Sequence, residues 1–171
     1  MSDTKQDQFL ALYEPVHERF ERFCRARVYG DMDYRDLINE SLLVAYDKME
    51  ALRKEEAFLS FLIGISVRIL SNNHQKKKEE RWSVATEKDK QDFTIGVSDP
   101  DIHFLYEGLS HLKDPQRECL ILFEISGFSV KEIAAIQNAS ESAVKQRLKR
   151  GRDKLTQILT FESSHKTGKA I

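Results

Sequence analysis

The chain has 171 residues, of which 40% are hydrophobic and 32% charged, with a formal net charge of −1. This composition is sufficient to bury a core, and the low content of glycine and proline favours helices. No apolar run approaches the roughly 18 residues of a membrane span, and the N-terminal sequence MSDTKQDQFL lacks the apolar core of a secretory signal. We therefore expect a cytoplasmic protein.

The sequence carries no motif that predicts catalysis. Cys24 and Cys119 lie far apart in apolar helical patterns without CxxC spacing, which predicts two ordinary buried thiols. The five histidines show no metal-ligand spacing, and there is no glycine-rich phosphate loop, nucleophile elbow or paired-carboxylate motif. The chain is not expected to be an enzyme or to bind a metal or another cofactor.

The N-terminal half is predicted to be helical throughout. Apolar residues recur at three- and four-residue steps from Phe9 to Phe20, and Pro15 should interrupt or start a helix there because it has no backbone N–H. Gly30 ends the segment, and Asp31 or Asp33 can cap the helix that follows. Two further helices are expected over about 33–50 and about 56–79.

The sequence RWSVATEKDKQDFTIGVSDP, residues 81–100, mixes charged residues with Ser, Thr, Gly and Pro and has no sustained period, which indicates a linker. Helical patterns resume at about 101–111. Asp114 and Pro115 should open the next helix as its cap and first residue, and that helix should stop near Gly127. No strand pattern of matching strength is present.

Residues 129–155, SVKEIAAIQNASESAVKQRLKRGRDKL, contain seven basic and three acidic residues. Ser129 and Glu132 form a capping box for a short helix, Asn138 suits a turn that needs a positive φ, and Ser140 caps a second helix. Two short helices in this arrangement predict a helix-turn-helix, whose second helix enters the major groove of DNA. Its exposed face should carry Ser142, Lys145, Gln146, Lys149, Arg150 and Arg152.

These residues resemble the extracytoplasmic-function sigma factors of bacterial RNA polymerase. The run LSHLKDPQRECLILFEISGFSVKEIAAIQNASESAVKQRLKRGRDKL is similar to their region 4. The run DYRDLINESLLVAYDKM resembles the region 2 helix that docks on the polymerase core, and AFLSFLIGISVRIL resembles the promoter-melting helix that follows. The resemblance covers roughly residues 5–80 and 103–158.

The resemblance implies an all-α fold of two small helical domains joined by a flexible linker. We expect a region 2-like domain for core polymerase and the −10 element, and a four-helix region 4-like domain with the helix-turn-helix for the −35 element. The expected boundaries are 1–80 for the first domain, 81–102 for the linker, 103–160 for the second domain and 161–171 for a disordered tail.

The resemblance also assigns roles to residues. Contacts with the polymerase are expected from Asp36, Leu37, Asn39, Glu40 and Leu43. Contacts at the −10 element are expected from Arg53, Lys54, Phe58, Phe61, Lys76, Lys77, Lys78 and Arg81. Recognition of the −35 element is expected from Ser142, Lys145, Gln146, Lys149 and Arg150, with Arg147 and Arg152 holding phosphates. For Phe58 and Phe61, a structural role in the core is the alternative.

Three departures from the family pattern lie in the segments that are expected to contact promoter DNA. Phe58 and Phe61 stand where the family usually has a tryptophan-containing aromatic pair, so they offer a stacking face without an indole donor. A family Asn and Asp in the melting helix are replaced by Arg68 and Asn72, and the usual turn glycine is Asn138.

The function that the resemblance implies is a sigma factor, a subunit that binds core RNA polymerase and directs initiation at alternative promoters. The family also implies an anti-sigma factor as a partner. Two alternatives remain open at the level of the sequence: a helix-turn-helix regulator that binds DNA without polymerase, and an adaptor that uses its helices for protein contacts only.

Overall fold

A computed structural model describes the backbone of residues 4–30, 32–83 and 99–167, with side chains described to residue 77 in the second range and to residue 161 in the third. Every regular element in these ranges is helical. The N-terminal half contains α1 (Lys5–Tyr13), α2 (His17–Val28), α3 (Tyr34–Asp47), the 3₁₀ turns η1 (Met49–Ala51) and η2 (Glu55–Ala57), and α4 (Phe58–Ser83). The C-terminal half contains α5 (Pro100–Ser110), α6 (Asp114–Leu120), η3 (Ile121–Ile125), α7 (Val130–Ile136) and α8 (Glu141–Thr167).

The helix boundaries in the N-terminal half follow local rules. Pro15 separates α1 from α2, and Gly30, at φ 77°, lies just beyond the end of α2. Asp33 is the N-cap of α3 and accepts a hydrogen bond from the Arg35 backbone N–H at 2.9 Å. The predicted caps and breaks are confirmed here, whereas Asp31 lies outside the described residues.

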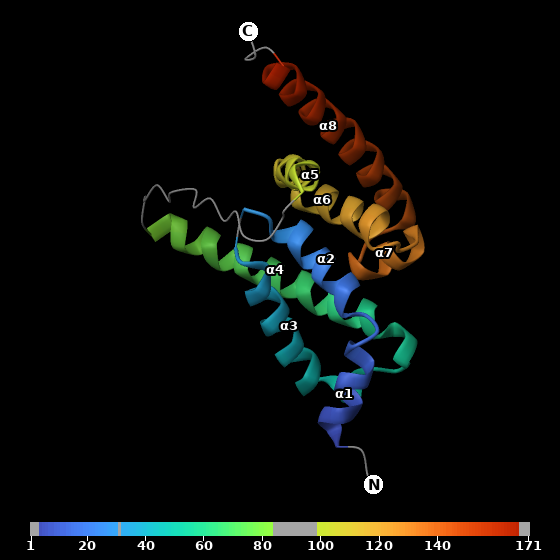
Figure 1. Ribbon diagram of the computed structural model, residues 1–171. Coiled ribbons are helices and arrows are strands. Elements are labelled where there is room, and N and C mark those ends of the chain that lie inside the picture. The colour runs from blue at the N-terminus through green and yellow to red at the C-terminus, as the bar shows by residue number, and fades with distance from the viewer. Residues whose placement is uncertain (1–3, 31, 84–98, 168–171) are drawn as a thin grey trace.

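Large aromatic and aliphatic side chains form the core of the N-terminal half. Phe20, Phe23, Leu37, Leu62 and Ile63 have no exposed surface, and burial of each side chain of this size is worth roughly 1.5–3 kcal/mol. These residues bring α2, α3 and α4 together, with α3 packed along α4 (Figure 1).

One hydrogen-bonded pair crosses the otherwise apolar contact between α3 and α4. Ser66 Oγ donates to the Leu62 carbonyl at 2.9 Å and lies 2.8 Å from Ser41 Oγ, so the Ser41 hydroxyl is the donor to Ser66. Both hydroxyls are therefore satisfied although neither is exposed to solvent.

Two expectations for the C-terminal half need correction, the cap of α6 and the disordered tail, whereas the helical segment predicted to stop near Gly127 does end there. Lys113, not Asp114, is the N-cap of α6, because the Asp114 carboxylate is engaged by arginine side chains. The helix after Leu120 widens into a π-helical turn, η3, in which the Ser126 N–H bonds to the Ile121 carbonyl at 2.9 Å. Helix α8 continues to Thr167, through most of the segment predicted as a disordered tail.

The predicted linker is shorter than expected at both ends, since α4 extends to Ser83 and α5 starts at Pro100. The rest of it, residues 84–98, lies outside the described residues. The two halves do not stand apart: α2 packs on η3 and α5, and α4 packs on α7 (Figure 1). Among the described helices, none is both long and apolar enough to cross a membrane.

Candidate nucleic-acid interface

The helix-turn-helix forms where the sequence places it. Glu132 Oε2 accepts from the Ser129 N–H at 2.8 Å, and Ser129 Oγ accepts from the Glu132 N–H at 3.3 Å. Ser129 Oγ also donates to Glu132 Oε2 at 2.7 Å. The two bonds from Ser129 to this carboxylate, the backbone one foremost, lower the pKa of Glu132 and keep it charged at the start of α7. Asn138 supplies the turn at φ 49°, and Ser140 Oγ caps α8 through the Ala143 N–H at 3.1 Å.

The inner face of α8 fixes the orientation of that helix. Val144 and Leu148 are buried, facing the side of α7 that carries the fully buried Ile133. One turn further on, Gly151 lies against Leu120 of α6, where an added Cβ would come within 3.1 Å of Leu120 Cδ1. This close contact between α6 and α8 was not predicted, because a glycine in a basic helical run gives no sign of what it will pack against.

The outer face of α8 is exposed, and its polar side chains are not used in contacts with the described residues. Ser142, Lys145, Gln146, Lys149 and Arg150 are all exposed. Within the described part of the chain, none of these side chains makes a hydrogen bond or an ion pair. Lysine and arginine can bind phosphates and guanine edges, and a glutamine amide can pair with adenine. The predicted base-reading residues therefore form one continuous surface.

The two predicted phosphate-binding arginines are already engaged inside the chain. Arg147 Nη1 donates to Gln137 Oε1 at 2.7 Å. Arg152 donates from Nε and Nη2 to Glu124 Oε1 at 3.0 and 2.7 Å, and its guanidinium lies over the Phe123 ring. To contact DNA, each would have to share or exchange these partners.

Gln137 joins three helices and was missed by the sequence reasoning. Besides the bond from Arg147, its Oε1 accepts from Cys119 Sγ at 2.9 Å, and its Nε2 donates to Glu118 Oε1 at 2.8 Å. Burial is the main reason that the pKa of Cys119 rises to about 11, so the thiol stays protonated and serves as a donor. Cys24 is also buried, and both cysteines are free, as predicted.

The predicted −10 residues divide into cations and two aromatic rings. Arg53 and Lys54 are exposed between η1 and η2, and Lys76 and Lys77 are exposed on α4. Lys78 and Arg81 also belong to α4, but their side chains lie outside the described residues.

Phe58 needs a correction, because it is only 1% exposed and its ring packs edge-on against Phe9 with centroids 5.5 Å apart. Such a ring supports the loop that precedes it and cannot stack on a base while it is in the core. Phe61 is half-buried, with its ring centroid 6.4 Å from that of Phe58, so part of its surface remains accessible.

The predicted polymerase-binding residues form a stripe along α3. Asp36, Asn39, Glu40 and Leu43 are exposed at three- and four-residue spacing, and Leu43 is 70% exposed. Leu37 has no exposed surface, so the expectation that it contacts a partner is corrected to a role in the core. An exposed leucine within an acidic stripe is suited to a protein partner with a basic and apolar surface.

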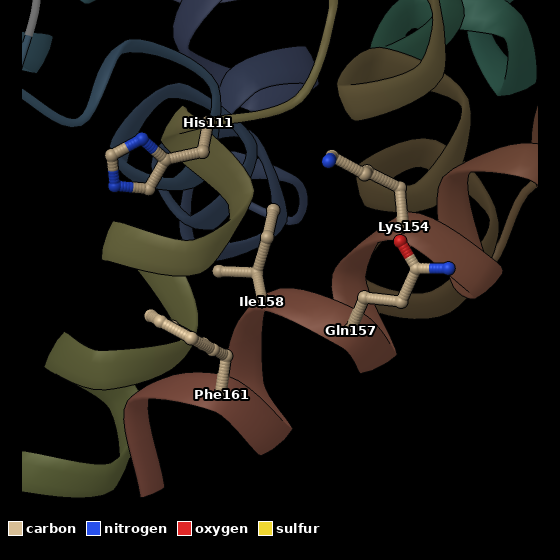
Figure 2. A pocket seen from close by; sticks show the side chains of 5 residues that line it. All are labelled: His111, Lys154, Gln157, Ile158 and Phe161. Carbon is tan, nitrogen blue, oxygen red and sulfur yellow. The ribbon is translucent and has the colours of Figure 1, made fainter. Parts of the chain in front are cut away.

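A shallow groove lies beside α8, away from the helix-turn-helix. It is lined by His111, Lys154, Gln157, Ile158 and Phe161, and Figure 2 shows Ile158 and Phe161 reaching from α8 toward α5. These side chains include no acid–base pair suited to catalysis. In the part of the chain that the structure describes, no three His, Cys, Asp or Glu residues gather as a metal site.

The chain is similar in sequence to known proteins. Residues 105–155 match the family described as Sigma-70, region 4. The chain is 27% identical over 175 residues to the ECF RNA polymerase sigma factor EcfG of Rhodopseudomonas palustris, covering 98% of this chain and 92% of the relative. It is 24% identical over 136 residues to the ECF RNA polymerase sigma-E factor of Haemophilus influenzae, covering 71% of each chain.

A solved structure shares the fold. The sigma factor RpoE from Bartonella quintana, crystallised with the anti-sigma factor NepR, superposes with a TM-score of 0.70 at 20% sequence identity. The superposition covers 88% of this chain and 98% of that one, so both halves and their connection order are common to the two proteins.

Proposed function

We infer from these matches that the chain belongs to the extracytoplasmic-function sigma factors, and we propose that it binds core RNA polymerase and directs it to promoters through the two surfaces described above. The observation that carries the proposal is the pairing of these surfaces in one chain. An unoccupied cationic and amide face on a helix-turn-helix is suited to DNA, and an exposed acidic stripe with Leu43 on α3 is suited to a protein. Sigma factors act by binding, and we propose no reaction for this chain.

We assign residues 1–80 to core polymerase and the −10 element, and residues 103–160 to the −35 element. On α3, Asp36, Asn39, Glu40 and Leu43 would contact the polymerase. On α8, Lys145, Gln146, Lys149 and Arg150 would read the −35 element, with Ser142 at the start of the same face. Arg53, Lys54, Lys76 and Lys77 would hold DNA near the −10 element, and Phe61 would offer its accessible edge to the same element.

Arg147 and Arg152 are proposed as secondary phosphate contacts because each already has an internal acceptor. Neither DNA surface needs to bind strongly alone, since tethering both on one polymerase raises the effective concentration of each. We also propose a cytoplasmic location, where the polymerase and DNA lie, and an inhibitory protein partner like the one crystallised with the Bartonella quintana relative.

The test is transcription by purified core polymerase, with and without this protein, on a library of random promoter DNA. We expect initiation that depends on the protein and shares two sequence elements upstream of the start sites. If no start site depends on the protein, while the protein alone binds one symmetric DNA sequence, the chain acts as an independent regulator and the proposal is wrong.

A further inference from the structure

Arg147 of α8 and Glu118 of α6 carry opposite charges but do not pair with each other. Glu118 is 6% exposed, and Arg147 is half-buried at the border of the exposed face of α8. Charged side chains are rarely buried unless they are paired, so a direct ion pair is the expected arrangement. Instead, the amide of Gln137 lies between the two groups and bonds to both.

The Gln137 amide has a partner for each of its hydrogen-bonding positions. Its Oε1 accepts from Arg147 Nη1 at 2.7 Å and from Cys119 Sγ at 2.9 Å. Its Nε2 donates to Glu118 Oε1 at 2.8 Å and to the Pro115 carbonyl at 3.3 Å. An amide oxygen can accept twice and an amide nitrogen can donate twice, so both ends are fully used. The reversed amide would set donor against donor, and its orientation is therefore fixed.

The backbone of Gln137 is held in place as well. Gln137 is the C-cap of α7, and its N–H bonds to the Ile133 carbonyl at 2.9 Å. Asn138 follows directly, at φ 49°, and begins the turn to α8. The side chain thus reaches toward α8 from a backbone that the helix end and the turn both define.

The bond to Gln137 uses only one edge of the Arg147 guanidinium. Within the part of the chain that the structure describes, its Nη2 and Nε make no hydrogen bond. The donors of a guanidinium form a rigid fork, so one fixed bond sets the direction of the others. The remaining donors can hold a phosphate through two parallel bonds while Nη1 stays on Gln137. Arg147 can therefore share its internal partner with DNA without giving it up.

Arg147 lies beside the side chains proposed to read bases. It directly follows the exposed Gln146 and comes three residues before the exposed Arg150, a spacing that makes neighbours on a helix surface. Phosphate contacts fix the register and orientation of a protein on the duplex, and base contacts depend on that position. A phosphate held by Arg147 would thus support base reading by its neighbours.

Loss of the Gln137 amide would affect Arg147 in two ways. The guanidinium would lose its fixed direction, and ordering it again on DNA would cost side-chain entropy. It could also turn inward to Glu118, whose Oε1 would have lost the donor that Gln137 provides. In both cases the DNA face loses an oriented positive charge.

We propose that Gln137 is a positioning residue for the −35 surface. Its neutral amide separates Arg147 from the Glu118 carboxylate and directs the rest of the guanidinium to a DNA phosphate. Gln137 acts through Arg147 and needs no contact with DNA of its own. This inference rests on the proposed function, because the phosphate that it assigns to Arg147 belongs to −35 DNA.

The test is a double-mutant cycle on Gln137 and Arg147 in the full chain. Affinity for a labelled −35 duplex, taken from the promoters that the transcription library identifies, is measured by fluorescence anisotropy over a salt series. Gln137→Met keeps the length of the side chain without the amide and should weaken binding about two- to tenfold. Arg147→Met should weaken it at least as much and lower the magnitude of the salt slope by about 1, because the phosphate contact itself is lost.

The double variant distinguishes positioning from a structural role. If Gln137 acts through Arg147, Gln137→Met should cause no further loss in the Arg147→Met background. A residue that only holds the helices together would cause the same loss in both backgrounds, and that result would overturn the proposal. Wild-type affinity in either single variant would do the same.

Gln157→Met is the matched control. It makes the same change at an exposed glutamine further along α8, and it should alter neither the affinity nor the salt slope. Thermal unfolding followed by circular dichroism shows that each variant is folded at the temperature of the titration. A loss in Gln157→Met as large as that in Gln137→Met would count against a special role for Gln137.

Arg147→Lys covers the case in which Gln137→Met does not fold. Lysine keeps the positive charge, so the salt slope should stay the same. An ammonium group is a point charge without the fork that Gln137 can orient, so the affinity should still fall by roughly twofold or more. Full affinity in Arg147→Lys would mean that charge alone is sufficient, and the positioning role would be wrong.

The outcomes separate this inference from the proposed function. If the wild type shows no preference for the −35 duplex, the DNA role of α8 fails and the role of Gln137 fails with it. If the wild type prefers that duplex but the losses at Gln137 and Arg147 are independent, the proposed function stands and only the positioning role is lost.

Discussion

Lys149 and Arg150 are the adjacent cations on which recognition of the −35 element is expected to depend most. Both are exposed on the outer face of α8 and have no partner among the described residues. Replacing both with Ala should abolish selection of −35 sequences, because loss of one good base contact costs about 1–3 kcal/mol. Binding to core polymerase should not change, since α3 is untouched.

The measurement for this pair is initiation on templates with intact and scrambled −35 elements, with co-purification of core polymerase as the binding control. Lys131→Ala is the matched variant, because it removes an exposed cation of α7 outside the proposed surface. Unchanged preference for the intact −35 element in the double variant would contradict the assignment.

Asn138 is the described residue other than glycine that adopts a positive φ, at 49°. Asn138→Ala should destabilise the chain by about 1 kcal/mol, because both residues carry a Cβ that disfavours this conformation but only asparagine has a short polar side chain that offsets the cost. Asn138→Gly should lose much less stability than Asn138→Ala. That difference would identify backbone strain as the cause. Thermal unfolding followed by circular dichroism measures both, and equal losses would contradict this explanation.

At the scale of the element, α3 is expected to determine affinity for the polymerase. Reversing the charge of Asp36 and Glu40 to Lys should weaken core binding at least tenfold, because like charges would then meet the basic partner surface that the stripe predicts. The affinity can be measured by titrating labelled protein with core polymerase.

Glu14→Lys with Glu18→Lys is the matched control for α3. Both glutamates are exposed in the same half of the chain but belong to the α1–α2 segment, so the change in net charge is identical. If the two double variants lose the same affinity, the effect is one of overall charge and α3 has no special role.

At the scale of the whole molecule, positive charge is concentrated on one segment of a nearly neutral chain. Residues 129–155 have seven basic and three acidic side chains, whereas the chain as a whole has a net charge of −1. Affinity for a −35 duplex should therefore fall linearly on a log–log plot against salt concentration, with a slope of about −0.9 per phosphate contacted.

Lys149→Ala should lower the magnitude of that slope by about 1 if this lysine contacts a phosphate, and leave it unchanged if it reads a base edge only. Fluorescence anisotropy over a salt series measures the slope. An affinity that does not depend on salt would exclude phosphate binding by the cationic face and favour a protein-only adaptor.

The sequence by itself determined the local features of this protein. The breaks at Pro15 and Gly30, the cap at Asp33, the capping box of α7 and the turn at Asn138 each depend on residues a few positions apart. The exposed face of α8 could be predicted for the same reason, because helical spacing places buried and exposed residues on opposite sides.

Only the tertiary structure decided the features that depend on residues far apart in the chain. Asp114 was predicted as a cap and instead binds arginines, one of which is 87 positions away. Phe58 and Leu37 belong to the core because of the helices packed over them. Gln137, Gly151 and the buried ion pair of Arg27 with Glu118 acquire their roles from partners on other helices. Helical periodicity shows which side of a helix is buried but not which side chains it will meet.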